Sequence, residues 1–232
     1  ATRALSAECT ASMSEAVVRM MEDEEAMVRL KLIEALPLIS ETVPTLCTLL
    51  VDNLKRAFAD PFWRIRKELL KASPLLIKNM GLEYFSGNFL AEYLSLFKDA
   101  VDEVRVSAGE SLGGMCLYAG GDFVQEHIFP TVKELAGEEY SLRIANLCGL
   151  RSILETDDVP DRLSADALAL LLAAGGDEVP NVRIRVAQAL GQVITRVADG
   201  GRPKIRALLG ELQVDKDTDV SFYAAESVRL CT

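Results

Sequence analysis

Hydrophobic residues along the chain fall in stripes with helical spacing, and a short signature within them recurs at regular intervals. The signature is an acidic residue, four variable residues, an apolar anchor and then a basic residue. Five of six units keep the acidic residue and five of six keep the basic residue, with Gly137 and Ser221 as the exceptions. In the best-formed units, apolar residues follow the anchor at four, five and eight positions, which places them on one face of a helix. The anchors are 37 to 40 residues apart: Val28, Ile65, Val104, Leu142, Val182 and Val220.

A second amphipathic stretch precedes the signature in each unit, so every unit is predicted to be a helical hairpin. The clearest of these stretches are residues 43–58, 84–97, 123–135 and 165–173. Residues that break helices, such as Gly81, Gly120 and Pro160, separate the units. The acidic residue suits a position just before a helix, because its side chain accepts free backbone N–H groups there.

These patterns predict an all-α fold, an α-solenoid of about six HEAT repeats with about twelve helices. A solenoid of this kind is a single array without division into domains, because each repeat contacts only its neighbours. We expect the Asp and Arg residues of adjacent repeats to form a ladder of ion pairs along the array. The predicted units are approximately residues 1–40, 41–80, 81–120, 121–158, 159–199 and 200–232.

Composition excludes several classes of partner. The chain has 25 basic and 35 acidic residues, and its net charge of −10 argues against a general attraction to nucleic acid or anionic membranes. No apolar run is long enough to span a bilayer. The five cysteines are scattered and form no CxxC pair, which argues against disulfides and zinc and favours a reducing compartment, the cytoplasm or the nucleus.

Catalytic chemistry has few residues available in this sequence. His127 is the only histidine, and no nucleotide-binding or metalloprotease motif is present. Paired acidic residues occur at predicted turns and helix starts, where carboxylates are stabilised by the helix dipole. We therefore predict a protein that is not an enzyme and that needs no cofactor and no metal.

Residues that depart from the repeat pattern are the candidates for binding a partner. Trp63 is the only tryptophan, and Phe62 and Arg64 flank it in the turn between two predicted helices. Trp and Arg are enriched among the residues that dominate binding energy at interfaces. The core of the repeat is the alternative location for Trp63. The equivalent turns of later repeats carry Asp102, Tyr140, Val179, Pro180 and Thr218, and stacking is expected to place these turns in a row.

Several segments, in order and at fixed spacing, resemble the scaffold (A) regulatory subunit of protein phosphatase 2A, a HEAT-repeat family. The likeness runs in register from about Asp60 to the C-terminus and matches the last six of that family's fifteen repeats. The segments are residues 63–66 (WRIR), 73–76 (SPLL), 81–85 (GLEYF), 128–130 (IFP), 140–143 (YSLR), 177–183 (DEVPNVR) and 219–226 (DVSFYAAE).

The resemblance implies that these repeats hold the phosphatase catalytic subunit through their intra-repeat turns. It also implies that regulatory subunits bind repeats further upstream, which this chain does not include. Asp102 stands where the family has a tyrosine, and Thr218 stands where it has a valine, so these two contacts are expected to differ. Four positions match contact residues of the family: Trp63, Arg64, Tyr140 and Val179.

Two other protein-binding functions are alternatives. A TOG-type tubulin-binding domain also has about six HEAT repeats and an aromatic residue in an early turn. Tubulin is acidic, however, and acidic turns such as Glu138-Glu139 and Asp177-Glu178 would repel it. An adaptor solenoid that recognises its partner through the inner helices is the second alternative. The chain is also expected to be part of a longer solenoid.

Overall fold

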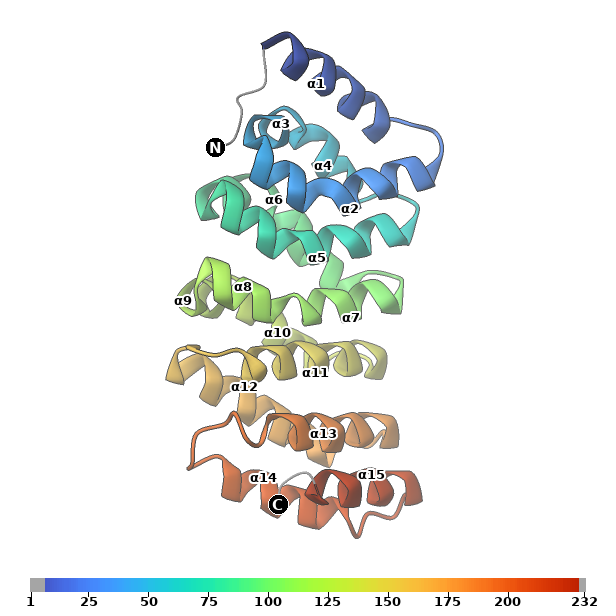
Figure 1. Ribbon diagram of the computed structural model, residues 1–232. Helices are drawn as coiled ribbons and strands as arrows, with labels where there is room; N and C mark the ends of the chain where they lie inside the picture. Colours follow the sequence, from blue (N-terminus) through green and yellow to red (C-terminus); the bar gives the residue numbers. More distant parts are fainter. Residues whose placement is uncertain (1–6, 230–232) are drawn as a thin grey trace. The chain divides into compact units, whose positions relative to one another are not determined.

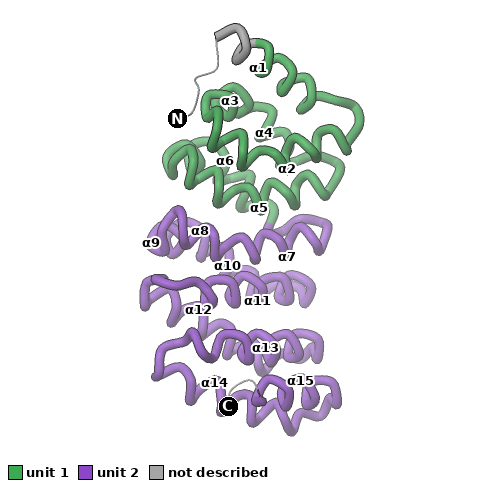
Figure 2. The backbone as a smooth tube through the Cα atoms, in the orientation of Figure 1, with its two compact units in different colours: residues 1–96 green, residues 97–232 purple. Residues whose placement is uncertain are grey.

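A computed structural model describes residues 7–229, and every regular element within that range is a helix (Figure 1). The first residues of the first predicted repeat, and Cys231, lie outside the described range. The chain divides into two compact units, residues 1–96 and 97–232 (Figure 2).

Unit 1 is a stack of helical hairpins. The long helices α2 and α5 are the second helices of consecutive repeats, and they pack side by side (Figure 1). Side chains that are at most 1% exposed, such as Leu36, Leu54 and Phe85, fill the space between the helices. The helices are α1 (Ala7–Met21), α2 (Ala26–Thr42), α3 (Pro44–Leu49), α4 (Val51–Ala57), α5 (Trp63–Met80) and α6 (Leu82–Ser95).

Unit 2 repeats the same arrangement. Its second helices α7, α11, α13 and α15 contact one another in succession, and α10, α12 and α14 pack against them. The 3-10 segments are η1 (Leu96–Lys98) and η3 (Ala174–Gly176), and η2 (Val124–Ile128) is a π-helical turn. The α-helices are α7 (Asp102–Glu110), α8 (Leu112–Ala119), α9 (Gly121–Phe123), α10 (Phe129–Leu135), α11 (Tyr140–Glu155), α12 (Asp161–Ala173), α13 (Pro180–Val193), α14 (Arg202–Leu212) and α15 (Thr218–Arg229).

The architecture confirms the predicted fold class, because both units consist of stacked helical hairpins. In the repeats that carry the acidic residue of the signature, the second helix begins shortly after it, as α5 does after Asp60 and α13 does after Asp177. The anchors Ile65 and Val182 are fully buried, as the periodicity requires. A single undivided array over the whole chain stays a prediction.

Two of the predicted first helices are interrupted. Residues 43–58 form α3 and α4, which meet at Leu50, where ψ is 7° and the side chain stays buried. Residues 123–135 pass through the π-helical turn η2, in which the N–H of Phe129 donates to the carbonyl of Val124, five residues earlier. Pro130 follows directly and has no N–H to donate, which favours a local change in the hydrogen-bond pattern.

Glycines allow the second helices of unit 2 to approach closely. A Cβ atom on Gly109 of α7 would lie 2.8 Å from the backbone nitrogen of Gly149 on α11. A Cβ atom on Gly113 would lie 2.8 Å from the Oγ of Ser152, which accepts a hydrogen bond from the Gly113 N–H at 2.9 Å. Gly113 therefore lets α8 pack closely against α11.

Candidate protein-binding surface

Ion pairs between consecutive repeats fix the turns that precede the second helices. The Nε and Nη2 atoms of Arg29 donate to the two carboxylate oxygens of Asp60 at 2.8 and 3.0 Å. Its Nη1 donates to the carbonyl of Asp23 in its own turn at 2.7 Å. The same forked arrangement joins Arg143 to Asp177 and Arg183 to Asp215. The predicted Asp–Arg ladder is thus confirmed at three junctions of the described chain.

The ladder of unit 2 holds the carboxylates of Asp177 and Asp215 in the ionised form. Hydrogen bonds from Arg183 lower the pKa of Asp215 despite the partial burial of that carboxylate. Burial alone would raise the pKa of Asp177, but hydrogen bonds from Arg143 and from the N–H of Val179 outweigh it, so the pKa is lowered. Both carboxylates are therefore charged throughout the neutral range.

This electrostatic arrangement predicts a loss of stability in acid. The folded pKa values of Asp177 and Asp215 lie below the ordinary value of 3.8, so protonation favours the unfolded chain. The stabilisation is complete above the unfolded pKa and is lost as the pH falls through the folded pKa. We expect the melting temperature, followed by circular dichroism, to be constant above about pH 5 and to fall below about pH 4. A constant melting temperature between about pH 4 and pH 2 would contradict the ladder's contribution.

In unit 1, four side chains gather at the start of α5 and form an aromatic–basic cluster: Phe62, Trp63, Arg64 and Lys67. The Asp60 carboxylate accepts the N–H of Phe62, the residue that directly precedes α5, at 2.8 Å. The Arg64 guanidinium lies 4.4 Å from the Trp63 ring centroid, and the Lys67 Nζ lies 5.7 Å from it. Trp63 is half-buried and Arg64 is exposed, so the tryptophan packs in part on the helix and in part against cations at the surface.

In unit 2, the candidate residues occupy equivalent places, and together they form a turn row. Asp102, Tyr140, Pro180 and Thr218 are the first residues of α7, α11, α13 and α15, and Val179 directly precedes α13. These helices are consecutive neighbours, and the ladder joins the starts of α11, α13 and α15 (Figure 1). Tyr140 is 52% exposed. The structure therefore places these five residues of unit 2 at the starts of consecutive second helices, whereas Phe62, Trp63 and Arg64 belong to unit 1.

The Asp102 carboxylate already has an intramolecular partner. It accepts a hydrogen bond from the Nη2 of Arg105, one helical turn further along α7, at 2.9 Å. The Asp102 side chain is 61% exposed, whereas the Arg105 side chain is 9% exposed. A binding partner that engages Asp102 must therefore share it with Arg105.

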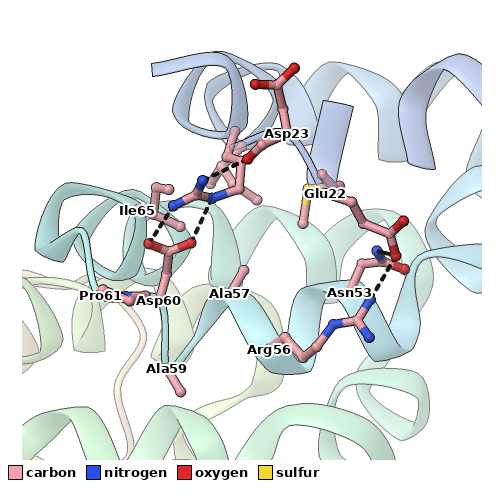
Figure 3. A pocket seen from close by; sticks show the side chains of 12 residues that line it. Glu22, Asp23, Asn53, Arg56, Ala57, Ala59, Asp60, Pro61 and Ile65 are labelled. Atoms are coloured by element: carbon pink, nitrogen blue, oxygen red, sulfur yellow. Dashed lines mark hydrogen bonds and ion pairs between the residues drawn. The ribbon is translucent and has the colours of Figure 1, made fainter. Parts of the chain in front are cut away.

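A pocket of about 470 Å³ lies among α1, α2, α4 and α5 in unit 1 (Figure 3). The Arg29–Asp60 pair forms one wall. On the opposite wall, Glu22 accepts hydrogen bonds from Asn53 at 3.2 Å and Arg56 at 3.0 Å. Because these charged groups neutralise one another, the pocket is a gap between repeats lined by structural ion pairs, and it offers no acid–base pair.

Among the side chains that the structure describes, the remaining reactive groups do not assemble into a site. Burial raises the pKa of Cys47 to about 11 and that of Cys116 to about 12, so both stay protonated at neutral pH. His127 is exposed in η2, with its ring 4.6 Å from that of Phe123. Within residues 7–229, no group of three or more His, Cys, Asp or Glu side chains could hold a metal ion. The described helices include none long and apolar enough to cross a membrane.

Comparison with known proteins identifies relatives among phosphatase regulatory subunits. The chain is 28% identical over 185 residues to the human protein named serine/threonine-protein phosphatase 4 regulatory subunit 1. It is 27% identical over 180 residues to the rat protein of the same name. Each match covers 70% of this chain but only 18% of the relative, so the chain spans less than a fifth of the relatives' length. No protein-family model matches the sequence.

Solved structures support the fold. Cex1p superimposes with a TM-score of 0.61 at 13% identity, over 96% of this chain and 43% of that chain. A chain from a Pds5–Scc1 complex gives a TM-score of 0.62 at 14% identity, over 94% of this chain and 35% of that chain. The sequence similarity to serine/threonine-protein phosphatase 4 regulatory subunit 1 confirms the expected likeness to a phosphatase regulatory subunit. The more specific resemblance to the 2A scaffold stays a prediction.

Two contacts of this surface were not predicted from the sequence. Lys67 follows Trp63 by four residues, a spacing that places both on one helix face, and this signal could have added it to the cluster. The contact of Arg105 with Asp102 could have been inferred from their spacing of three residues on one helix. Its contact with Ser141 of the next repeat depends on how the helices stack.

Proposed function

We propose that this chain is a non-catalytic scaffold that binds and positions the catalytic subunit of a type 2A-like serine/threonine phosphatase through its intra-repeat turns. The observation that carries the proposal is the turn row of unit 2, which presents an exposed Tyr140 between equivalent turns. The likeness to a phosphatase regulatory subunit supports the choice of partner. The scaffold would act by position and would contribute no chemical step.

The two surfaces suit different patches of a protein partner. The aromatic–basic cluster of unit 1 combines a large ring with the exposed guanidinium of Arg64, a combination that is common at the centres of interfaces. It fits an acidic or carbonyl-rich patch. The turn row carries Asp102 together with exposed acidic neighbours such as Glu139 and Asp219, and so it fits a basic patch.

Binding measurements with purified catalytic subunits of protein phosphatases 2A and 4 test this function. We expect the chain to bind at least one of them and the Trp63→Ala/Arg64→Ala double variant to bind at least about 30-fold more weakly, since losing one dominant interface residue costs about 2 kcal/mol. Lys71→Ala is the matched control, because Lys71 lies on the same helix and its side chain is 54% exposed. This variant is expected to bind as the wild type does.

The outcomes separate the function from the site. If neither catalytic subunit binds the wild-type chain, the proposed function is wrong. If one binds equally well to the wild type and the double variant, the function stands and the aromatic–basic cluster is not part of the interface. The tubulin alternative has less support, because the acidic turn row would repel an acidic partner. If the chain co-sediments with microtubules and does not bind a phosphatase catalytic subunit, tubulin binding becomes the better-supported function.

A further inference from the structure

The ion-pair ladder lacks its acidic residue at one junction of unit 2. Arg105 of α7 occupies the place that Arg143 and Arg183 occupy in the next repeats. Residue 137, the counterpart of Asp177 and Asp215, is a glycine. The Arg105 side chain is only 9% exposed, so a largely buried guanidinium here lacks the carboxylate that its counterparts bind.

The hydrogen bonds of Arg105 show which of its guanidinium nitrogens lacks a partner. Its Nη1 donates to the carbonyl of Asp99 at 2.8 Å, as the other ladder arginines do within their own turns. Its Nη2 donates to Asp102 at 2.9 Å and to the Oγ of Ser141 at 3.2 Å. Its Nε is buried and has no hydrogen-bond partner among the described residues. The Nε–Nη2 edge, which binds an acid at the other junctions, is therefore only partly used.

Ser141 provides a hydroxyl at this edge. It is the second residue of α11, and it is half-buried. Its Oγ accepts from Arg105 and donates to Glu139 Oε1 at 2.7 Å. The first turn of a helix stabilises negative charge through its free N–H groups and the helix dipole. A charged group on this oxygen would thus lie between an arginine and a helix start.

We propose that Ser141 is a phosphorylation site and that its phosphate supplies the acid that residue 137 lacks. In the reaction, the Ser141 Oγ attacks the γ-phosphorus of a nucleoside triphosphate bound to a protein kinase. The bond between that phosphorus and the bridging oxygen breaks, a nucleoside diphosphate leaves, and the hydroxyl proton passes to a base of the kinase. The phosphate oxygens then bind the Nε–Nη2 edge of Arg105 as a bidentate pair.

Acidic neighbours oppose the added charge, but they are free to adjust. The Asp102 side chain is 61% exposed and Glu139 is exposed, so both carboxylates turn into water when the phosphate takes Arg105. Glu138 is already paired with Lys98 at 3.1 Å. The acidic residues before Ser141 also match the basic substrate groove of an acid-directed kinase.

Phosphoserine placed at position 141 of the 232-residue chain by amber suppression tests the structural part of the proposal. We expect the melting temperature to rise by about 2–4 °C. We also expect amide exchange to slow at the starts of α7 and α11. The matched background is Gly137→Asp, which supplies the missing carboxylate; a Cβ atom at residue 137 comes no closer than 3.7 Å to another atom, the Glu134 carbonyl oxygen. In the Gly137→Asp background the phosphoserine should not raise the melting temperature, because Arg105 is already paired with the new carboxylate.

Each outcome decides part of the proposal. An unchanged or lower melting temperature on phosphorylation of the otherwise wild-type chain overturns it. An equal rise in both backgrounds overturns the role of Arg105, because the phosphate would then act through the helix start alone. Incubation with cell lysate and ATP, followed by phosphopeptide mass spectrometry with Ser141→Ala as the reference, tests the modification. Failure to detect a phosphate on Ser141 overturns the site.

Discussion

Replacing Arg183 with leucine is expected to lower the free energy of unfolding of unit 2 by about 3 kcal/mol or more. The Arg183 side chain is 6% exposed and the Asp215 side chain is 12% exposed, so both charges are largely removed from water. Without the guanidinium, the buried Asp215 carboxylate keeps the N–H of Asp217 but loses its counter-ion. The carbonyl of Asp177 also loses its donor.

Urea denaturation and amide hydrogen exchange measure this loss. Since repeat proteins unfold locally at their interfaces, α14 and α15 should exchange faster in the variant than in the wild type. Asp157→Ala is the matched control, because it removes the Arg196–Asp157 pair, in which the aspartate is 83% exposed. That change should cost less than about 1 kcal/mol. Equal losses of unfolding free energy in the two variants would show that burial of the Arg183–Asp215 pair does not increase its contribution to stability.

Gly109→Ala is expected to destabilise unit 2 by about 2–3 kcal/mol through overpacking. The new Cβ atom would lie 2.8 Å from the nitrogen of Gly149 and 2.9 Å from the carbonyl oxygen of Ala145. Both are backbone atoms of α11, so no side-chain rotation relieves the contact and the two helices must move apart. This cost exceeds the gain of about 1 kcal/mol that alanine has over glycine as a helix former.

The control for this prediction is another glycine-to-alanine change in the same unit. Gly210 is exposed in α14, and a Cβ atom there would meet no atom within 4 Å. Gly210→Ala should therefore stabilise the chain by about 0.5–1 kcal/mol. Thermal melts of the two variants should shift in opposite directions. A rise in melting temperature for both would contradict the close approach of α7 and α11.

The repeat pattern carried most of the information about the fold. Anchors such as Ile65 and Val182 are fully buried, and the helices that contain them begin shortly after the acidic residues, as the pattern predicts. The interruptions at Leu50 and at Val124–Ile128 were not predicted, because they depend on a few backbone hydrogen bonds rather than on hydrophobic spacing. The apolar residues have nearly the same spacing in the sequence whether the helix is continuous or its backbone hydrogen bonds shift locally by one residue.

The candidate surface was only partly predictable. Equivalent positions in the signature gave the starts of α7, α11, α13 and α15, and the structure places the residues of the turn row there. The sequence also shows that Gly137 departs from the pattern. It does not show that Arg105 also contacts Ser141 of the next repeat, because that contact depends on distances between two helices.

The ladder also makes the ion pairs at successive repeat junctions equivalent to one another. Arg143 and Arg183 present the same fork, and Asp177 and Asp215, 38 positions apart in the sequence, present the same acceptor. A chain that lost residues 177–214 would bring Arg143 against Asp215, and a chain that duplicated them would extend the ladder by one step. Gain or loss of one whole repeat in this stretch would therefore keep the ion pairs between repeats, whereas an insertion of any other length would misplace Arg and Asp.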